Sequence, residues 1–155
     1  MLDQIAQMPV VQVPHQAPIR LSSRALTRVA VRAMRDGRQG AAVIEDAKGF
    51  LVGLFTERNA LQKLDLSNDS WKERPVVDFM SQDRAPIRTD TTLADAIDLM
   101  HRGPFRHLAI VDDYDHAVGI LSIRDVMVFV VEHFPEHFAN LPIDPAREAR
   151  LLYGG

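Results

Sequence analysis

The sequence predicts an α+β fold in which two β-α-β-β-α units pack against each other as a pseudo-twofold pair. Three observations lead to this prediction. The letters APIR occur twice, at residues 17–20 and 85–88. Helix-like and strand-like patterns follow both copies in the same order, as expected of an internal repeat. A unit of about 45 residues is too small to bury a core of its own, so each half needs the other.

Composition excludes several classes of function. The 155 residues carry a formal net charge of −3 and contain no cysteine, which excludes disulfides, thiolate metal sites and thiol catalysis. A nucleic-acid-binding domain normally has a basic surplus, so we expect no nucleic-acid partner. No apolar run approaches the roughly 20 residues of a membrane span, and the first residues lack the basic start of a secretory signal. We therefore expect a cytoplasmic protein with no membrane partner.

Each half contains a helix with one apolar face shortly after APIR. In the first half the apolar positions follow the spacing i, i+3, i+4, i+7 and i+8, which predicts an amphipathic helix. They are Leu26, Val29, Ala30, Ala33 and Met34. The second half repeats the pattern at an offset of 67 with Leu93, Ala96, Ile97 and Met100, after the candidate N-caps Asp90, Thr91 and Thr92.

Two short strands and a second helix complete each unit. Residues 41–46 (AAVIED) match residues 108–113 (LAIVDD) at an offset of 67, and both end in acidic residues that suit a turn. Residues 50–56 (FLVGLFT) match residues 117–122 (AVGILS) with the offset reduced to 66, and a helix follows each. The offset thus falls from 68 to 67 to 66, and we expect the single-residue losses to lie in loops.

The repeat divides the chain into four segments. We place the first unit, with its N-terminal lead, at residues 1–66, a polar linker at 67–75 and the second unit at 76–134. Residues 135–155 form a proline-containing tail that has no counterpart in the first half, and its prolines interrupt any long helix. Three roles stay open for the tail: packing over a sheet edge, covering a dimer interface or docking on a partner.

The segments GLFTERN and GILSIRD each place a hydroxyl residue three positions before a polar residue at a helix start. The pairs are Thr56 with Asn59 and Ser122 with Asp125. The structural interpretation is a capping box, in which side chain and backbone satisfy each other. The functional interpretation is an anion and diol site, because a helix start offers free amides and the Asp125 carboxylate can accept hydrogen bonds from a ribose. The basic residues nearby are Arg106, His107 and Arg124.

The ordered segments APIRTDTTLADAIDLM, FRHLAIVDD and AVGILSIRDV resemble a cystathionine-β-synthase (CBS) domain, and the first half resembles a more diverged copy. From about residue 19 to residue 134 the chain resembles a CBS pair, or Bateman module. The resemblance implies two β-α-β-β-α repeats packed sheet to sheet and a regulatory rather than catalytic role. It implies no required cofactor, but AMP, ADP, ATP or S-adenosylmethionine as an energy-sensing or regulatory ligand. It also implies a homodimer and a regulated partner protein whose identity is unknown.

The resemblance assigns candidate ligand residues in two clefts. In the main cleft, Asp125 corresponds to the ribose-binding acid, Ser122 to the hydroxyl at the helix start, and Arg106 and His107 to positions that face phosphates, with Arg124 beside them. The base would lie against the opposite repeat, near Ile19, Leu21, Gln39 and Gly40. The second cleft would use Thr56, Asn59, Ile87 and Thr89, together with the start of the second repeat's middle strand.

We expect the two clefts to be unequal. Asn59 replaces the acid, and Gln39 and Gly40 stand where the second repeat has Arg106 and His107, which would remove phosphate-facing charge. The Asn59 cleft should therefore be weak or empty. Two rival functions stay open: a dimerisation or interaction module whose clefts are filled by side chains, and an enzyme, for which no nucleophile, metal set or paired carboxylates converge in the sequence.

Overall fold

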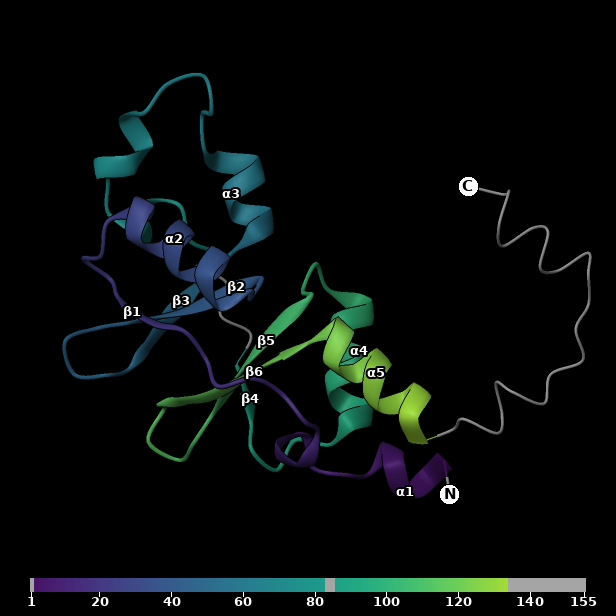
Figure 1. Ribbon diagram of the computed structural model, residues 1–155. Helices are drawn as coiled ribbons and strands as arrows, with labels where there is room; N and C mark the ends of the chain where they lie inside the picture. The colour runs from purple at the N-terminus through teal and green to yellow at the C-terminus, as the bar shows by residue number, and fades with distance from the viewer. Residues whose placement is uncertain (1, 83–85, 134–155) are drawn as a thin grey trace, which may run out of the picture.

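The computed structural model describes residues 2–82 and 86–133, and in this part of the chain it contains two halves of the same design (Figure 1). The first half consists of β1 (Arg20–Ser22), α2 (Thr27–Gly37), β2 (Ala41–Glu45), β3 (Leu51–Thr56) and α3 (Glu57–Lys63). The second consists of β4 (Ile87–Arg88), α4 (Leu93–Arg102), β5 (His107–Val111), β6 (Ala117–Ser122) and α5 (Ile123–His133). The predicted α+β class and the β-α-β-β-α order of both units are confirmed.

Each half has a mixed three-stranded sheet with the middle strand paired on both sides. In the first sheet β1 pairs in parallel with β2, and β2 pairs antiparallel with β3. The second sheet repeats this with β4, β5 and β6. A helix connects the parallel strands in each half, as a parallel pair requires. Each sheet therefore carries its two helices on one face and leaves the other face for the opposite half.

The strand registers relate the two halves by a constant offset of 66 in residue number. Leu21 lies opposite Ile44, which lies opposite Gly53. Ile87, Ile110 and Gly119 make the same row at that offset in the second sheet. The expected drift from 68 to 66 is therefore wrong. The two APIR copies do not occupy equivalent positions, because they are displaced by two residues from the offset of 66. This displacement does not change the alternation of inward and outward side chains, which has a period of two along a strand.

The same offset holds in the helices. The expected apolar face of the first helix began at Leu26, but Leu26 is the N-cap residue and lies outside α2. Buried positions of α2 and α4 match in pairs at the offset of 66, and the pairs are Thr27 with Leu93, Ala30 with Ala96, and Met34 with Met100. Thr27 escaped the apolar pattern because its hydroxyl donates to the carbonyl oxygen of Arg74 at 2.8 Å, which satisfies it inside the core.

The segments that precede the two units are exchanged between them. The N-terminal residues form α1 (Leu2–Ala6) and the 3-10 helix η1 (Val10–Gln12), and the backbone N–H of Val10 donates to the Thr91 carbonyl of the second half. The segment that contains the 3-10 helices η2 (Ser70–Glu73) and η3 (Val76–Asp78) lies on the first half, where Val76 N–H donates to the Ala25 carbonyl. The domain boundaries stay a prediction, but each lead segment packs on the unit that it does not precede.

Three groups of buried side chains form the core. One lies between the second sheet and its helices and includes Val10 and Val13 from the N-terminal lead. A second fills the same place in the first half and includes Val76 and Phe79. The third joins the two sheets face to face, and its members are Ala41, Val43, Leu51, Leu54, Ala109, Val111, Ala117 and Ile120. This third group holds the halves together and places β2 and β6 in contact with each other.

Candidate functional site

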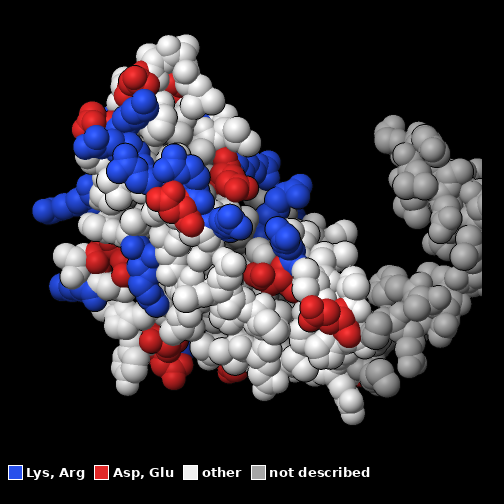
Figure 2. Space-filling model, in the orientation of Figure 1, with Lys and Arg blue, Asp and Glu red and all other residues white. Residues whose placement is uncertain are grey.

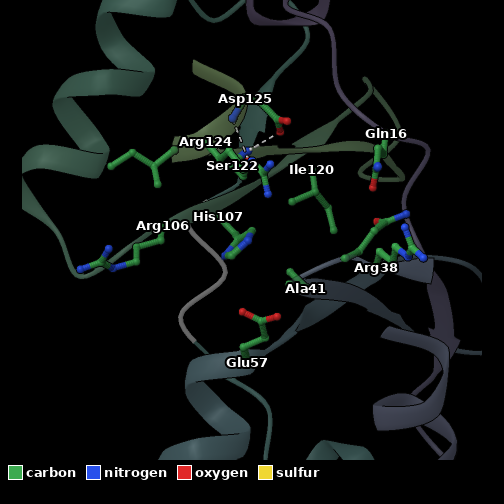
Figure 3. Close-up of a pocket in the computed structure, with 13 residues that line it drawn as sticks. Gln16, Arg38, Ala41, Glu57, Arg106, His107, Ile120, Ser122, Arg124 and Asp125 are labelled. Carbon is green, nitrogen blue, oxygen red and sulfur yellow. Dashed lines mark hydrogen bonds between the residues drawn. The ribbon is translucent and has the colours of Figure 1, made fainter. Parts of the chain in front are cut away.

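A cavity of about 620 Å³ opens between the two halves at one end of the junction between the sheets (Figure 3). The first half contributes the end of α2, the start of β2 and the start of α3, and the second contributes β5, β6 and the start of α5. Its lining residues are Gln16, Arg38, Gln39, Gly40, Ala41, Glu57, Arg106, His107, Ile120, Ser122, Ile123, Arg124 and Asp125. The volume lies in the range of small-molecule sites.

Asp125 and Ser122 form a reciprocal capping box at the start of α5. The backbone N–H of Ser122 donates to Asp125 Oδ2 at 2.9 Å, and the backbone N–H of Asp125 donates to Ser122 Oγ at 3.0 Å. The structural interpretation of the motif is therefore correct. The box occupies one carboxylate oxygen only, and among the described residues nothing donates a hydrogen bond to Asp125 Oδ1. That oxygen keeps its capacity to accept hydrogen bonds from a ligand in the cavity.

His107 lies at the centre of the cavity, between Asp125 of its own half and Glu57 of the other half (Figure 3). Burial lowers the pKa of the His107 imidazole below its usual 6.5, although the carboxylates of Glu57 and Asp125 act in the opposite direction. His107 is therefore neutral near pH 7, with one ring nitrogen that donates and one that accepts. Gly40 leaves room for it, because a Cβ at position 40 would lie 3.2 Å from His107 Nε2 and 3.4 Å from the Glu57 carboxylate.

Three arginines line the cavity. Arg38 comes from the first half, where it ends α2 in the left-handed conformation with φ 52°. This conformation costs a non-glycine residue about 1–2 kcal/mol, so a functional role for the guanidinium would account for the residue. The second arginine, Arg124, follows Ile123 at the start of α5. The third is Arg106, and Figure 3 shows its side chain pointing away from Arg38 and Asp125. Lys and Arg side chains also gather over the first half of the molecule in Figure 2.

The structure brings together seven of the nine residues predicted for the main cleft. Ser122, Arg124, Asp125, Arg106, His107, Gln39 and Gly40 all line the cavity. Ile19 and Leu21 do not; both pack against the hydrophobic core of the first half. Sequence reasoning missed Arg38 and Glu57, which border the cavity from α2 and α3. The sequence offered one signal for each residue, which is its position next to a recognisable motif. Arg38 follows Gly37 at a helix end, and Glu57 directly follows the Thr56 hydroxyl of the capping motif.

A second cavity of similar volume, about 620 Å³, lies at the start of α3 and contains two of the four residues predicted for the second cleft. Thr56 and Asn59 form the equivalent capping box, in which Asn59 Oδ1 accepts the Thr56 N–H at 3.0 Å. Ile87 is buried in the core of the second half, and the Thr89 carbonyl accepts a hydrogen bond from Val11. Neither Ile87 nor Thr89 lines this cavity.

Two details of the expected asymmetry are wrong. Ala41 pairs with Thr56 as His107 pairs with Ser122, so Ala41 and Gly40, rather than Gly40 and Gln39, stand in the places of His107 and Arg106. The second cavity is also not stripped of positive charge, since its lining includes Arg58, Lys63 and Arg106. What distinguishes it is Asn59, which is only 8% exposed and offers an amide where the main cavity has a carboxylate.

Both the sequence and the fold of this chain have counterparts among known proteins. The profile of the CBS domain matches residues 76–132, which cover most of the second half. A 17.7 kDa protein from Acidianus ambivalens is 32% identical over 121 residues, which are 78% of this chain and 70% of that protein. The chain belongs to the CBS domain family. The profile does not extend over the first half, but the constant register offset of 66 identifies that half as the other CBS repeat of the pair.

Solved CBS structures have the same fold. A CBS domain protein from Pyrobaculum aerophilum, complexed with AMP, superimposes with a TM-score of 0.71 at 22% identity and covers 81% of this chain and 97% of its own. The CBS domain pair of protein MJ0100, in complex with 5′-methylthioadenosine and S-adenosyl-L-methionine, gives a TM-score of 0.70 at 20% identity and covers 79% and 99%. At these identities the likeness concerns the fold, and the ligands belong to those proteins.

The helices and side chains within residues 2–82 and 86–133 offer neither a membrane span nor a metal site. No helix there has the length and apolar character needed to cross a bilayer. The same residues contain no group of three or more metal-ligating side chains that could hold an ion. The expected roles of the tail at 135–155 lie outside the described residues.

Proposed function

We propose that this CBS pair is a non-catalytic sensor that binds an adenosine-containing nucleotide in the cavity at the start of α5 and passes its occupancy to a partner protein. The ligand class comprises AMP, ADP, ATP and S-adenosylmethionine. The observation that carries the proposal is the uncommitted Oδ1 of Asp125, on a residue that lines a cavity whose other polar groups include arginines from both halves. The AMP and S-adenosyl-L-methionine complexes of proteins with this fold support the same ligand class.

Each part of the nucleotide has a complementary group in the cavity. The ribose diol would donate to Asp125 Oδ1, and a charge-assisted hydrogen bond of this kind contributes about 1.5–3 kcal/mol. Phosphates would lie against Arg38 and Arg124, whose guanidinium groups can bind them with two hydrogen bonds each. The apolar side chain of Ile120, which lines the cavity and is 7% exposed, offers a surface for the base.

Signalling would follow from the position of the cavity between the halves. A ligand that contacts Arg38 of the first half and Asp125 of the second favours the arrangement of the two halves in which both contacts form. The free energy by which it shifts this equilibrium is at most the difference between its binding free energies for the two arrangements. A cytoplasmic location is a part of the proposal that rests on the apolar pattern and the N-terminal residues, and a regulated partner protein is a part that rests on the sequence resemblance.

Isothermal titration calorimetry tests the proposal with AMP, ADP, ATP and S-adenosylmethionine on the full chain, with GMP as the control nucleotide. We expect at least one adenosine ligand to bind with one site per chain and GMP to bind more weakly. Absence of heat for all four adenosine ligands at millimolar concentration, together with an unchanged melting temperature, would refute the sensor.

The rival is a dimerisation module without a ligand. It required clefts filled by side chains, and the volume of about 620 Å³ at Asp125 weighs against filled clefts. The exposed apolar residues of α5 favour an association surface, but such a surface and a ligand site are compatible with each other.

A further inference from the structure

The outer side of α2 carries a row of three arginines. Arg28, Arg32 and Arg35 recur at intervals of four and three residues, so they lie on one side of the helix. All three are exposed, and Lys and Arg side chains gather over this half of the molecule in Figure 2. In the described part of the chain Arg32 has no ion-pair partner, while the partners of Arg28 and Arg35 are themselves exposed acids. Because exposed ion pairs contribute little to stability, the row remains available to an anion from outside the chain.

The fold does not require this basic row. The counterparts of the three arginines on α4, at the offset of 66, are Ala94, Asp98 and His101. Residues 1–66 contain nine Lys and Arg and six Asp and Glu, whereas residues 76–134 contain five and ten. The row also destabilises α2 itself, because it places like charges four residues apart and a cation in the first turn. A contact specific to the first half therefore accounts for the arginines better than the folding of the helix does.

A groove of about 500 Å³ lies beside the row, between α2 and α3. Its lining includes four apolar side chains and two arginines, which are Val31, Met34, Phe55, Ala60, Arg35 and Arg38. Arg35 thus belongs to both the row and the groove. We name this groove, together with the three arginines beside it, the α2 groove.

Two residues explain why the first half has space here. At the offset of 66, Phe105 stands at the position of Gln39, and Val126 at that of Ala60. Phe105 packs against the core of the second half, and Val126 is buried in it. In the first half the Gln39 side chain instead donates to the Ala17 carbonyl oxygen at 3.0 Å, and Ala60 is smaller than valine. The volume that Phe105 and Val126 occupy is therefore left open beside α2.

The chemistry of the α2 groove fits an acidic, amphipathic protein segment. A guanidinium can bind a carboxylate with two hydrogen bonds, and the row extends over about 10 Å along α2, so a helix with acids at the same spacing can pair with it. Apolar side chains of that helix would lie against Val31 and Ala60. A nucleic acid would leave this apolar floor uncovered. Its bases stack on exposed aromatic rings, and Phe55 in the groove is fully buried.

We propose that the α2 groove binds an acidic amphipathic helix of the regulated partner protein. Arg38, Gln39 and Glu57 line both this groove and the cavity at the start of α5. The carboxylates of the partner and the phosphates of a nucleotide therefore compete for the Arg38 guanidinium, which is how occupancy of the cavity reaches the partner. This competition rests on the proposed function, whereas the docking itself requires no nucleotide.

Fluorescence anisotropy on the full chain tests the docking with a labelled helical peptide of about 15 residues, in which glutamates and leucines recur at helical spacing. The control peptide has glutamine in place of every glutamate. We expect the acidic peptide to bind at least about tenfold more tightly than the control peptide, and Arg35→Glu to remove most of that difference. Equal affinities of the two peptides would overturn the proposal.

Arg102→Glu is the matched control variant. It makes the same change of charge on α4, where Arg102 is 78% exposed and pairs with Asp98, as Arg35 is 73% exposed and pairs with Asp36. We expect it to bind the acidic peptide as tightly as the wild-type chain does. An equal loss in Arg35→Glu and Arg102→Glu would show that net charge, and not the α2 groove, attracts the peptide, and would overturn the proposal.

Ala60→Leu distinguishes a protein segment from a nucleic acid. The larger side chain fills the groove without changing its charge, so the variant should bind the acidic peptide more weakly. Thermal melts of each variant establish that the chain is folded. A single-stranded RNA of the same net charge should bind the wild-type chain more weakly than the peptide does. An RNA that binds more tightly than the peptide, with an affinity that Ala60→Leu does not change, would overturn the proposal in favour of a nucleic acid.

The competition for Arg38 is tested by repeating the peptide titration with saturating AMP. We expect AMP to weaken binding of the acidic peptide, and the peptide to weaken binding of AMP by the same factor. Calorimetric binding of AMP with no change in peptide affinity would contradict the competition. If AMP does not bind at all, the proposed function fails, and the titrations without nucleotide still decide whether the α2 groove docks the peptide.

Discussion

The substitution Asp125→Asn separates the ligand role of Asp125 from its capping role. The amide oxygen of an asparagine can accept the Ser122 N–H, just as Asn59 accepts the Thr56 N–H at 3.0 Å. The capping box therefore survives, while the free acceptor Oδ1 becomes an NH₂ group that donates. The variant gives the main site the amide that Asn59 supplies in the second cavity, by a single functional-group change.

The expected loss follows from the bonds removed. A hydrogen bond from a ribose hydroxyl to a carboxylate contributes about 1.5–3 kcal/mol, and roughly 1.4 kcal/mol corresponds to a tenfold change in Kd. Asp125→Asn should therefore weaken AMP binding by roughly 10- to 150-fold. The free energy of unfolding should fall by only about 0.3–1 kcal/mol, the contribution of a carboxylate at a helix N-terminus.

Calorimetric titration with AMP measures the first quantity and thermal denaturation the second. The matched control is Asn59→Asp, which makes the reverse exchange at the equivalent position and should leave the affinity at the Asp125 site unchanged. If Asp125→Asn binds AMP as tightly as the wild-type chain, the carboxylate does not hold the ribose. An equal loss in Asn59→Asp would show that the effect is not local to the Asp125 site.

Three further predictions concern strain, protonation and packing. Arg38→Gly should leave the free energy of unfolding unchanged or raise it by up to about 1 kcal/mol, because it relieves the positive φ. In titrations the variant should bind AMP more weakly but adenosine as tightly as the wild-type chain does. Weaker adenosine binding would contradict a phosphate role for Arg38. Because the folded pKa of His107 lies below 6.5, the contribution of its neutral imidazole to the free energy of unfolding is complete above that pH and is lost as the pH falls through the folded pKa. Urea titrations should show a smaller loss of stability at low pH in His107→Gln. A pH profile of stability that is the same in the variant and the wild-type chain would count against this role of His107. Gly53→Ala should lower the free energy of unfolding by about 1–3 kcal/mol in the same assay, because the new Cβ would lie 2.6 Å from the Ser81 carbonyl oxygen. Gly119→Ala should lower it less, because its Cβ meets the movable side-chain ring of His15. A larger loss in Gly119→Ala than in Gly53→Ala would refute this packing.

The fold class, the element order and most of the main cavity could be predicted from the sequence, because these depend on local signals. The Ser122–Asp125 box is read from spacing alone, and its helix start defines one wall of the cavity. Gln39 and Gly40 also line the cavity as expected, since they precede the middle strand of the opposite repeat.

The residue-by-residue equivalence of the two halves could not be predicted from the amino-acid sequence. APIR drew attention to an offset of 68, but hydrogen-bond register decides equivalence, and a displacement by two positions leaves the buried face of a strand unchanged. The role of Thr27 in the core depends on a carbonyl oxygen at Arg74, which lies far away in the chain. The exchange of lead segments likewise rests on long-range backbone hydrogen bonds, such as Val10 to Thr91, for which no local pattern exists.

Arg38 and Glu57 illustrate the same limit at the site. Each reads locally as an ordinary helix-terminal residue, and only the packing of the two sheets places them in one cavity with Asp125 and His107. Ile19 and Leu21 show the converse, because apolar residues of the first strand fit a base-binding surface in sequence but are used in the core of their own half.

Comparing AMP with 2′-deoxy-AMP on the wild-type chain tests the central claim most directly, because the protein is unchanged and the ligand lacks one hydroxyl. If Asp125 binds the ribose diol, calorimetry should show 2′-deoxy-AMP binding at least roughly tenfold more weakly, with the difference absent in Asp125→Asn. Equal affinities of the two nucleotides for the wild-type chain would contradict the account.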